Sequence, residues 1–460
     1  MERLLQAIQD AVIWYANWIW GTPLLILLMG GGLYFVFYSR FIPYRYFIHA
    51  INVLRGKYDK PGEEGEINHY EALSTALAAT VGMGNVSGVA VALTMGGPGA
   101  IFWMWVSAAV GMVTKYFTIT LAVMFRGKDD TGATQGGPMY VIEQGMGKRW
   151  KPLAVFFSLT AMVGALPIFQ ANQLTQVIRD VVLKPNGWDN GITTNWIIGL
   201  SLMAIVSAVI FGGIKRIASV AGKLVPVMVV VYFISVLYIL ILNAGAIPSS
   251  LMLIFNDAFT GNAVLGGAVG SVIIIGAKRA AFSNEAGIGT APMVQGQAKT
   301  DEPIREGIVG MLGPAIDTLL VCTLTALAIL ITGTWTEAGI DGVTVTVHAF
   351  NKAIPDLGGY VLFIAVLIFA ITSLFSYSYY GEKSLTYLIG RKKARQYRVI
   401  YVLTIVLGAV ASLTFIISII DAFYAMMAIP TMISALWLSP KVMEETKKYF
   451  AKLKESKKAS

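Results

Sequence analysis

The sequence predicts an all-α polytopic membrane protein with about eleven transmembrane helices, and three observations lead to this prediction. Only 13% of the 460 residues are charged, 56% are hydrophobic, and the mean hydropathy is +0.67. A soluble globular protein carries about 25% charged residues. Apolar runs of about 20 residues, the length of a helix that crosses a bilayer, recur along the whole chain. Lysine and arginine gather in every second loop between these runs, which is typical of a membrane topology.

The apolar runs give approximate limits for the spans, following the length rule for a bilayer-crossing helix. They cover residues 17–37, 70–94, 98–125, 152–182, 193–212, 218–243, 263–280, 307–332, 359–381, 397–418 and 420–437. Very little sequence separates the last two runs, and Asp421 is predicted to mark a tight turn there.

Basic residues in the loops predict how the chain is oriented. The loops after runs 1, 3, 5, 7 and 9 hold most of them, including Arg126, Lys278, Arg279 and Lys392. We therefore expect a multi-pass protein of the cell membrane, with the N-terminus outside and the C-terminus in the cytoplasm. The basic tail at 438–460 is expected to lie near anionic lipid. The net charge of +9 is then a topology signal and argues against a nucleic-acid surface.

Setting the first run aside leaves ten, which divide into two groups of five that start from opposite sides. That arrangement predicts an inverted-topology repeat. We expect four segments: an N-terminal span and loop at 1–69, a first repeat at 70–243, a second repeat at 263–437, and the tail. Spans interrupted by glycine at matching positions indicate the binding site of such a protein. The candidates are TVGMGNVSG (Thr80–Gly88) in the first repeat and the interruption at Gly276 in the second.

A helix broken in mid-membrane has chemistry suited to a zwitterion and a cation. Its unpaired carbonyl groups carry partial negative charge and suit Na⁺, and its unpaired amides carry partial positive charge and suit a carboxylate. Gly82 and Gly84 allow the ligand to approach the backbone, and Asn85 and Ser87 can hydrogen-bond the freed groups. A packing face is the alternative, since Gly84 and Gly88 also form a GxxxG pair.

Two stretches resemble hallmarks of a known family. GGPGAIFWMWVSAAVG (Gly96–Gly111) resembles the signature of the alanine/glycine:cation symporters, also named the sodium:alanine symporter family, and SNEAGIGTAP (Ser283–Pro292) is similar to a second hallmark. The resemblance covers about residues 10 to 440. It implies a symporter of alanine or glycine coupled to a cation, usually Na⁺. It also implies the ten-helix inverted-repeat (LeuT-like) fold of sodium-coupled amino-acid and neurotransmitter transporters, with broken first helices in both repeats.

That fold family breaks its first core helix at a sequence like VGLGN, which is similar to VGMGN here (Val81–Asn85). The resemblance implies that carbonyl groups of Ala78 and Val81, with the hydroxyls of Thr372 and Ser373, face a sodium ion. It implies a substrate-binding segment at Thr80, Gly82, Met83, Gly84 and Asn85. Thr80 and Asn85 would also lie beside a second sodium.

Other polar residues in the apolar runs have two readings each. Gln170 is either a pocket residue, bonded to the substrate, or interhelical polar contact with Gln173. Asp317 is an intramembrane carboxylate and by default a functional candidate, as a second cation or proton site with Asn85; the alternative is a structural pair with Lys115. Ser271, and Gly276 beside it, are candidates for the other wall of the pocket, although a helix serine can simply bond its own backbone.

Glu285 lies close in sequence to Lys278 and Arg279. We expect it to form a cytoplasmic gate or loop-fixing ion pair with them and not to bind substrate.

The function predicted from these features is secondary symport of a small neutral amino acid, alanine or glycine, with Na⁺. The chain has no Walker motif, HExxH or GxSxG, so neither ATP hydrolysis nor these enzyme classes fit. Nothing resembles the repeated filter or charged ring of a channel. The predicted partners are the amino acid, Na⁺ and membrane lipid. A proton-coupled amino-acid symporter with Asp317 as the carrier is the alternative.

Overall fold

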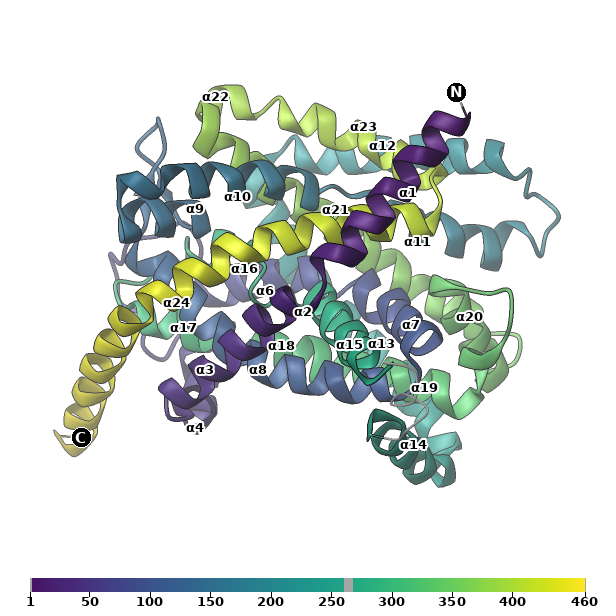
Figure 1. Ribbon diagram of the computed structural model, residues 1–460, viewed down its shortest axis with the longest axis horizontal. Helices are drawn as coiled ribbons and strands as arrows, with labels where there is room; N and C mark the ends of the chain where they lie inside the picture. Colours follow the sequence, from purple (N-terminus) through teal and green to yellow (C-terminus); the bar gives the residue numbers. More distant parts are fainter. Residues whose placement is uncertain (1, 260–267, 460) are drawn as a thin grey trace.

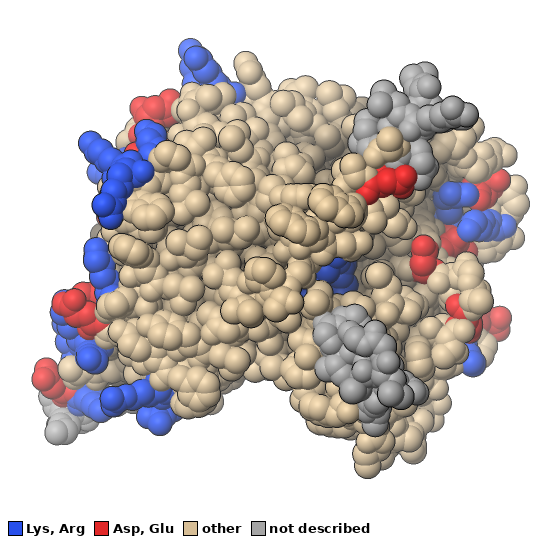
Figure 2. Space-filling model, viewed as in Figure 1, with Lys and Arg blue, Asp and Glu red and all other residues tan. Residues whose placement is uncertain are grey.

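The computed structural model describes residues 2–259 and 268–459, and the side chains of residues 268–271 lie outside the described part. Most helices run between two ends of the molecule (Figure 1). One end carries α4, α9, α22 and the C-terminus, and the other carries α14, α20 and the N-terminus. Lysine and arginine gather at the first of these, on the left in Figure 2, which we name the basic end. A broad face with few charged side chains lies between the two ends, as expected for a lipid-facing surface.

The N-terminal span is bent. α1 (Glu2–Ile19) meets the following helix at an angle of 47°. The side chain of Trp20, at the bend, donates a hydrogen bond of 2.7 Å from Nε1 to the backbone carbonyl of Asp421. This contact holds the bend against the last helix of the chain. The span continues as α2 (Thr22–Leu25), a π-helical turn (Ile26–Gly30) and α3 (Gly31–Tyr38), and is followed by α4 (Ile42–Arg45) and α5 (Phe47–Leu54).

The first repeat begins with a span that is broken in its middle. A capping box formed by Asn68 and Glu71 starts α6 (His69–Thr80), and α7 (Met83–Gly96) begins beyond Val81 and Gly82. The repeat continues with α8 (Gly99–Met124), the hairpin of β1 (Gly127–Lys128) and β2 (Thr134–Gln135), α9 (Pro138–Tyr140), α10 (Lys151–Gly164), α11 (Ile168–Ile178), α12 (Ile192–Ile210) and α13 (Gly213–Leu242). α14 (Ile247–Phe259) follows and packs against α8.

The second repeat also begins with a broken span. α15 (Ala268–Asn284) ends before a short unwound segment, in which Gly287 and Gly289 have φ values of 82° and 106° that favour glycine. The chain continues as α16 (Thr290–Gln295), α17 (Pro303–Gly310), α18 (Leu312–Pro314), a π-helical segment (Ala315–Cys322), α19 (Thr323–Thr332), α20 (Gly342–Ala353), α21 (Gly358–Ile389), α22 (Arg391–Ala394), α23 (Tyr397–Val410) and α24 (Leu413–Ala459).

The spans broadly match the prediction. Within the described chain, eight helices are long and apolar enough to cross a membrane, or nine if the bent N-terminal pair counts as one span. The two remaining predicted spans correspond to α15 and α23, which have 17 and 14 described residues. Part of the run at 263–280 lies outside the described residues.

Two predictions about charged residues are wrong. Asp421 does not mark a turn: the break between α23 and α24 lies at Ala411 and Ser412, and Asp421 is buried inside α24. Lys278 and Arg279 do not lie in a loop but within α15, where both pair with Asp421 at 2.8 and 2.6 Å. A carboxylate placed opposite two cations allows Asp421 and Arg279 to be buried, with Lys278 partly buried beside them. α24 also passes position 437 without a break.

Candidate substrate and cation site

The break in the first repeat lies directly against α21. The hydroxyl of Ser373 donates a hydrogen bond of 3.0 Å to the carbonyl of Ala78, in the last turn of α6. A Cβ at Gly82 would lie 2.4 Å from the same hydroxyl oxygen, so this approach requires glycine. Thr372 is buried beside it and donates to carbonyls of its own helix at 2.9 and 3.0 Å. The Ser373 hydroxyl therefore faces backbone carbonyls of α6, with no carboxylate among the hydrogen bonds described for them, and such oxygen donors suit a hard cation such as Na⁺.

The first turn of α7 supplies amide groups at the same place. Met83 and Gly84 open this helix, and the first amides of a helix have no intrahelical acceptor. The Gly82 amide donates to Asn85 Oδ1 at 2.8 Å. The positive end of the α7 dipole thus lies at the break, a position that suits a carboxylate.

Asn85 and Asp317 tie the two broken spans together. Asn85 Nδ2 donates to Asp317 Oδ1 at 2.6 Å. Ser283, the penultimate residue of α15, donates to Asp317 Oδ2 at 2.6 Å, and Thr318 donates to the same oxygen at 2.8 Å. Asp317 is fully buried. The side-chain oxygen of Asn85 already accepts a hydrogen bond from the Gly82 amide, so the group that faces Asp317 Oδ1 is the Asn85 amide nitrogen, a donor. A donor to the carboxylate stabilises its ionised form.

Glu285 holds the second break in place. It is buried and lies in the left-handed region with φ 55°. Its carboxylate accepts a hydrogen bond of 2.9 Å from the hydroxyl of Tyr424, and further hydrogen bonds from Thr290 and Tyr377. The prediction of an ion pair with Lys278 and Arg279 is therefore wrong, because those cations pair with Asp421 instead. Glu285 links the unwound segment to α21 and α24.

Gln170 brings α11 to the break. Its Oε1 is buried and has no hydrogen-bond partner in the described part of the chain, although buried polar atoms are usually paired. The neighbouring Phe169 ring lies edge-on to Phe282 of α15, with centroids 4.8 Å apart. Cβ atoms at Gly84 and Gly88 would lie 3.6 and 3.5 Å from the Phe282 ring. An acceptor that lacks a donor thus lies one residue from an aromatic contact with the end of α15.

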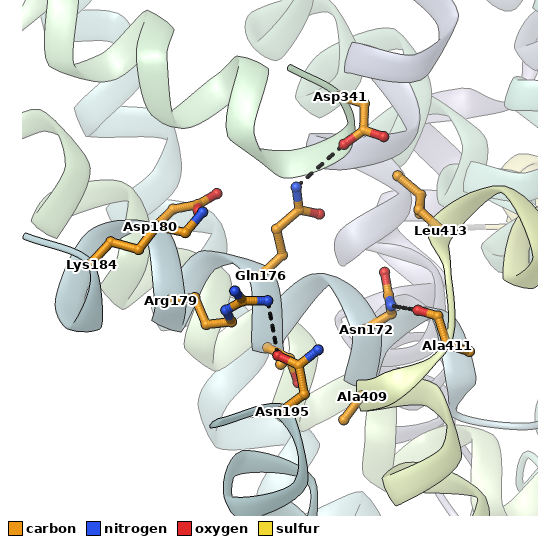
Figure 3. A pocket seen from close by; sticks show the side chains of 11 residues that line it. Asn172, Gln176, Arg179, Asp180, Lys184, Asn195, Asp341, Ala409, Ala411 and Leu413 are labelled. Atoms are coloured by element: carbon orange, nitrogen blue, oxygen red, sulfur yellow. Dashed lines mark hydrogen bonds and ion pairs between the residues drawn. The ribbon is translucent and has the colours of Figure 1, made fainter. Parts of the chain in front are cut away.

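Helix α11 continues from the break toward a cavity at the end of the molecule opposite the basic end. Figure 3 shows this cavity, with a volume of about 280 Å³, where Gln176 of α11 and Arg179, just after α11, face Asp341 and Asn195. Gln176 donates to Asp341 at 3.3 Å, and Arg179 donates to Asn195 at 3.1 Å. Between this cavity and the break, Gln173 Oε1 accepts hydrogen bonds from the Ser87 hydroxyl and the Val343 amide, at 2.5 and 2.9 Å. This polar chain separates the cavity from the break.

The structure brings most of the predicted site residues together and separates one of them. Gly276 lies within α15, where a Cβ would meet Trp103 Cβ at 2.6 Å and the Ala100 carbonyl at 2.7 Å. It is a close-packing contact with α8, and the interruption lies at residues 285–289 instead. The side chain of Ser271 lies outside the described residues. Among the described ion pairs there is none between Lys115 and Asp317, although both are buried.

Several residues at the site were not predicted. Ser283, Thr318 and Cys322 surround Asp317 and Asn85: Asn85 Nδ2 lies 3.3 Å from Cys322 Sγ. Tyr377 and Tyr424 bind the second break. The SNEAGIGTAP stretch held the signal for the break, since it places three small or turn-forming residues directly after a helix. The partners on other helices carry no local signal of their own.

The arrangement is that of an inverted-repeat membrane transporter, and comparison with known proteins agrees. The structure of MhsT in complex with L-phenylalanine superposes with a TM-score of 0.60, covering 83% of this chain and 98% of that one at 15% identity. This likeness shows the fold alone.

Sequence comparison gives the family. The model of the sodium:alanine symporter family matches residues 5–460. The sodium/alanine symporter AgcS of Methanococcus maripaludis is 41% identical, with 94% of this chain and 95% of that one aligned. The probable sodium/glutamine symporter GlnT of Bacillus subtilis is 33% identical, with 98% and 93% aligned. The chain belongs to the sodium:alanine symporter family. It is a sodium-coupled amino-acid symporter and not an enzyme.

Proposed function

We propose that this symporter takes up alanine or glycine together with Na⁺ by alternating access. The observation that carries the proposal is the pair of broken spans, α6–α7 and α15–α16, joined through Asn85, Asp317 and Ser283. Unwound backbone inside a membrane is tolerated only where it is buried in protein or lines a cavity. Two such segments side by side supply both polarities of backbone charge to one place.

The sodium ion binds, in this proposal, where α6 meets α21. Its ligands are carbonyl groups of Ala78 and Val81 and the hydroxyls of Thr372 and Ser373. The 3.0 Å contact between the Ser373 hydroxyl and the Ala78 carbonyl supports this assignment, because a cation between the two oxygens would replace that hydrogen bond. The hydroxyl can rotate its proton away and present a lone pair to the ion.

The substrate binds to the other half of the break. The amides of Gly82, Met83 and Gly84 face its carboxylate, with Thr80 and Asn85 at the edge of the site. Gln170 Oε1, which has no partner in the described part of the chain, accepts a hydrogen bond from the ammonium group. Binding would thereby satisfy a buried acceptor that otherwise costs about 1–3 kcal/mol.

Aromatic rings limit the size of the substrate side chain. Phe282 packs between Phe169 and the glycines of α7, so a large substrate side chain beside Gly84 would meet this ring. This supports alanine or glycine for this chain, whereas the relative GlnT is named for glutamine.

Asp317 acts as a fixed negative charge beside the break, with Asn85, and neutralises a second cation. Its hydrogen bonds come from an amide and two hydroxyl groups, which favours the ionised form. Proton coupling is the alternative role of this carboxylate, and the uptake experiment below separates the two.

The basic end faces the cytoplasm in this proposal, following the bias of lysine and arginine. The N-terminus is then outside, and the basic tail at 438–460 lies at anionic lipid. We propose the same four segments that the sequence predicts, at 1–69, 70–243, 263–437 and 438–460. The cavity of Figure 3 is the outer entrance, and rocking of one group of spans against the other exposes the breaks to each side in turn.

Uptake by the purified protein in liposomes tests the proposal. Labelled alanine or glycine should accumulate under an inward Na⁺ gradient and should not accumulate under a proton gradient alone. Uptake that ignores Na⁺ but follows protons would favour Asp317 as a proton carrier. Ion currents without accumulation of either amino acid would contradict symport altogether.

A further inference from the structure

The basic end contains a cavity of about 720 Å³ that is separate from the breaks. On α21, Lys383 lines this cavity, ten positions after Ser373. At 1.5 Å per residue, it lies about 15 Å along the helix from the Ser373 hydroxyl. The other walls come from the segment before α6, the β1–β2 hairpin, the turn between α12 and α13, the loop after α16, and α22 with the start of α23.

The lining of this cavity carries excess positive charge. Five basic and three acidic residues give it a formal net charge of +2: Lys299, Lys383, Arg391, Arg395 and Arg398 against Glu66, Asp129 and Glu382. Two of the acids form ion pairs with cations of the same lining: Asp129 pairs with Arg391 at 3.4 Å, and Glu382 pairs with Arg398 at 2.7 Å. Three cations, Lys299, Lys383 and Arg395, then remain against one acid, Glu66.

Lys299 and Arg395 have no ion-pair partner among the residues that the structure describes, and both are exposed. Lys299 follows α16, and Arg395 lies between α22 and α23, so the two come from different walls. Lys383 is buried, and its Nζ bonds the carbonyl of Met293 and, at 3.1 Å, the hydroxyl of Tyr379. No carboxylate neutralises any of these three in the described ion pairs.

We propose that this cavity binds a small phosphate-class oxyanion with two negative charges. The volume lies in the range of small-molecule sites, about 300–1,000 Å³. A dianion balances the formal net charge of +2, whereas a zwitterionic amino acid would leave it unbalanced. Arg395 presents the planar donor fork that matches phosphate oxygens, and Lys299 adds a point charge from the facing wall. The bound anion would bridge the loop after α16 to α22.

Binding of inorganic phosphate to the purified full-length chain in neutral detergent tests this proposal. Equilibrium dialysis with labelled phosphate, at ionic strength held constant with chloride, should show saturable binding. The double variant Lys299→Gln with Arg395→Gln should lower the affinity at least tenfold. Lys392→Gln is the matched control, because Lys392 is an exposed cation of α22, three residues before Arg395, that does not line the cavity. It should leave the affinity unchanged.

The same oxyanion chemistry could come from free phosphate compounds or from a lipid headgroup. Repeating the measurement in vesicles with and without phosphatidic acid, whose phosphomonoester headgroup can carry two negative charges, distinguishes these sources, since competition by the lipid identifies the headgroup. Either result supports an oxyanion-binding site in this cavity. Binding that is not saturable, or that falls equally in the Lys392→Gln control and the double variant, would overturn the proposal. None of these measurements depends on transport, so the outcome is independent of the function proposed above.

Discussion

The Ser373 hydroxyl lies 3.0 Å from the Ala78 carbonyl oxygen, although the two residues are 295 positions apart in the chain. One belongs to α21 in the second repeat and the other to α6 in the first. The contact brings a side-chain oxygen to the end of a broken helix, where carbonyl groups have lost their amide partners. Two oxygens that meet without a carboxylate suit Na⁺, and this relationship leads to the first prediction.

Replacing Ser373 by alanine should weaken Na⁺ coupling and leave the protein folded. Loss of one ligand worth about 1.4 kcal/mol raises the Na⁺ concentration for half-maximal uptake about tenfold. The matched control is Ser378→Ala, since this buried hydroxyl of the same helix bonds, in the described part of the chain, a carbonyl of its own turn, that of Phe375. Equal Na⁺ dependence in both variants would show that Ser373 is not a ligand.

Gly82→Ala should abolish uptake. The added Cβ would lie 2.4 Å from the Ser373 oxygen, so the break or α21 must shift. Gly245→Ala should have no effect, because Gly245 is exposed and a Cβ there meets nothing within 4 Å. Both variants are compared for uptake and for thermal stability. Normal uptake by Gly82→Ala would mean that the close approach to α21 is not needed for transport.

Asp317→Asn removes the buried charge and nearly keeps the shape of the side chain. We expect Na⁺-driven uptake to fall by at least tenfold, because the second cation loses its counter-charge. Asp356→Asn, an exposed residue in the left-handed region that asparagine also adopts, is the control. Uptake by Asp317→Asn that keeps its Na⁺ dependence but loses its response to pH would instead assign the carboxylate to proton transfer.

A structural prediction concerns Asp421, which accepts hydrogen bonds from Arg279 at 2.6 and 2.7 Å and pairs with Lys278. Asp421→Asn would leave the buried Arg279 and the partly buried Lys278 without a counter-charge, which costs about 3–5 kcal/mol. A clearly lower thermal unfolding temperature should result. Glu444→Gln breaks an exposed pair with Lys448 and should cost at most about 1 kcal/mol. Similar losses in the two variants would contradict the account.

The pH dependence of stability should include a contribution from Asp189, in the loop between α11 and α12. Hydrogen bonds from Arg179, at 3.0 and 2.8 Å, hold the pKa of Asp189 below its ordinary range. A depressed pKa stabilises the folded state at pH values above the ordinary pKa of about 3.9, and this stabilisation is lost as the pH falls further. The stability difference between the wild type and Asp189→Asn should therefore shrink below about pH 4. A difference that is constant with pH would contradict the pairing.

The sequence predicted the membrane class, the inverted repeat and the first break, because these depend on local signals. Runs of apolar residues set the spans, and VGMGN placed the unwinding at Val81 and Gly82, where the structure has it. The second break was misplaced at Gly276. A glycine inside an apolar run looks the same whether it opens a helix or lets another helix approach, and here Trp103 of α8 decides the matter.

Contacts between distant helices could not be predicted in the same way. From the sequence, Lys278 and Arg279 are expected in a loop, because a charged side chain inside a membrane span has a high free-energy cost. Asp421 on α24 supplies the counter-charge that allows them to lie within α15. Likewise, the sequence suggests an ion pair between Glu285 and its sequence neighbours, whereas its partners Tyr377 and Tyr424 lie on α21 and α24. Both errors have the same cause: a counter-charge or donor supplied from another part of the chain.

The central claim is that one break binds both Na⁺ and the amino acid. Equilibrium binding of labelled alanine to the purified protein at increasing Na⁺ concentration tests it most directly. The account predicts that Na⁺ raises the affinity for alanine, that alanine raises the affinity for Na⁺ by the same factor, and that Ser373→Ala removes most of this coupling. An alanine affinity that stays the same with and without Na⁺ would contradict it.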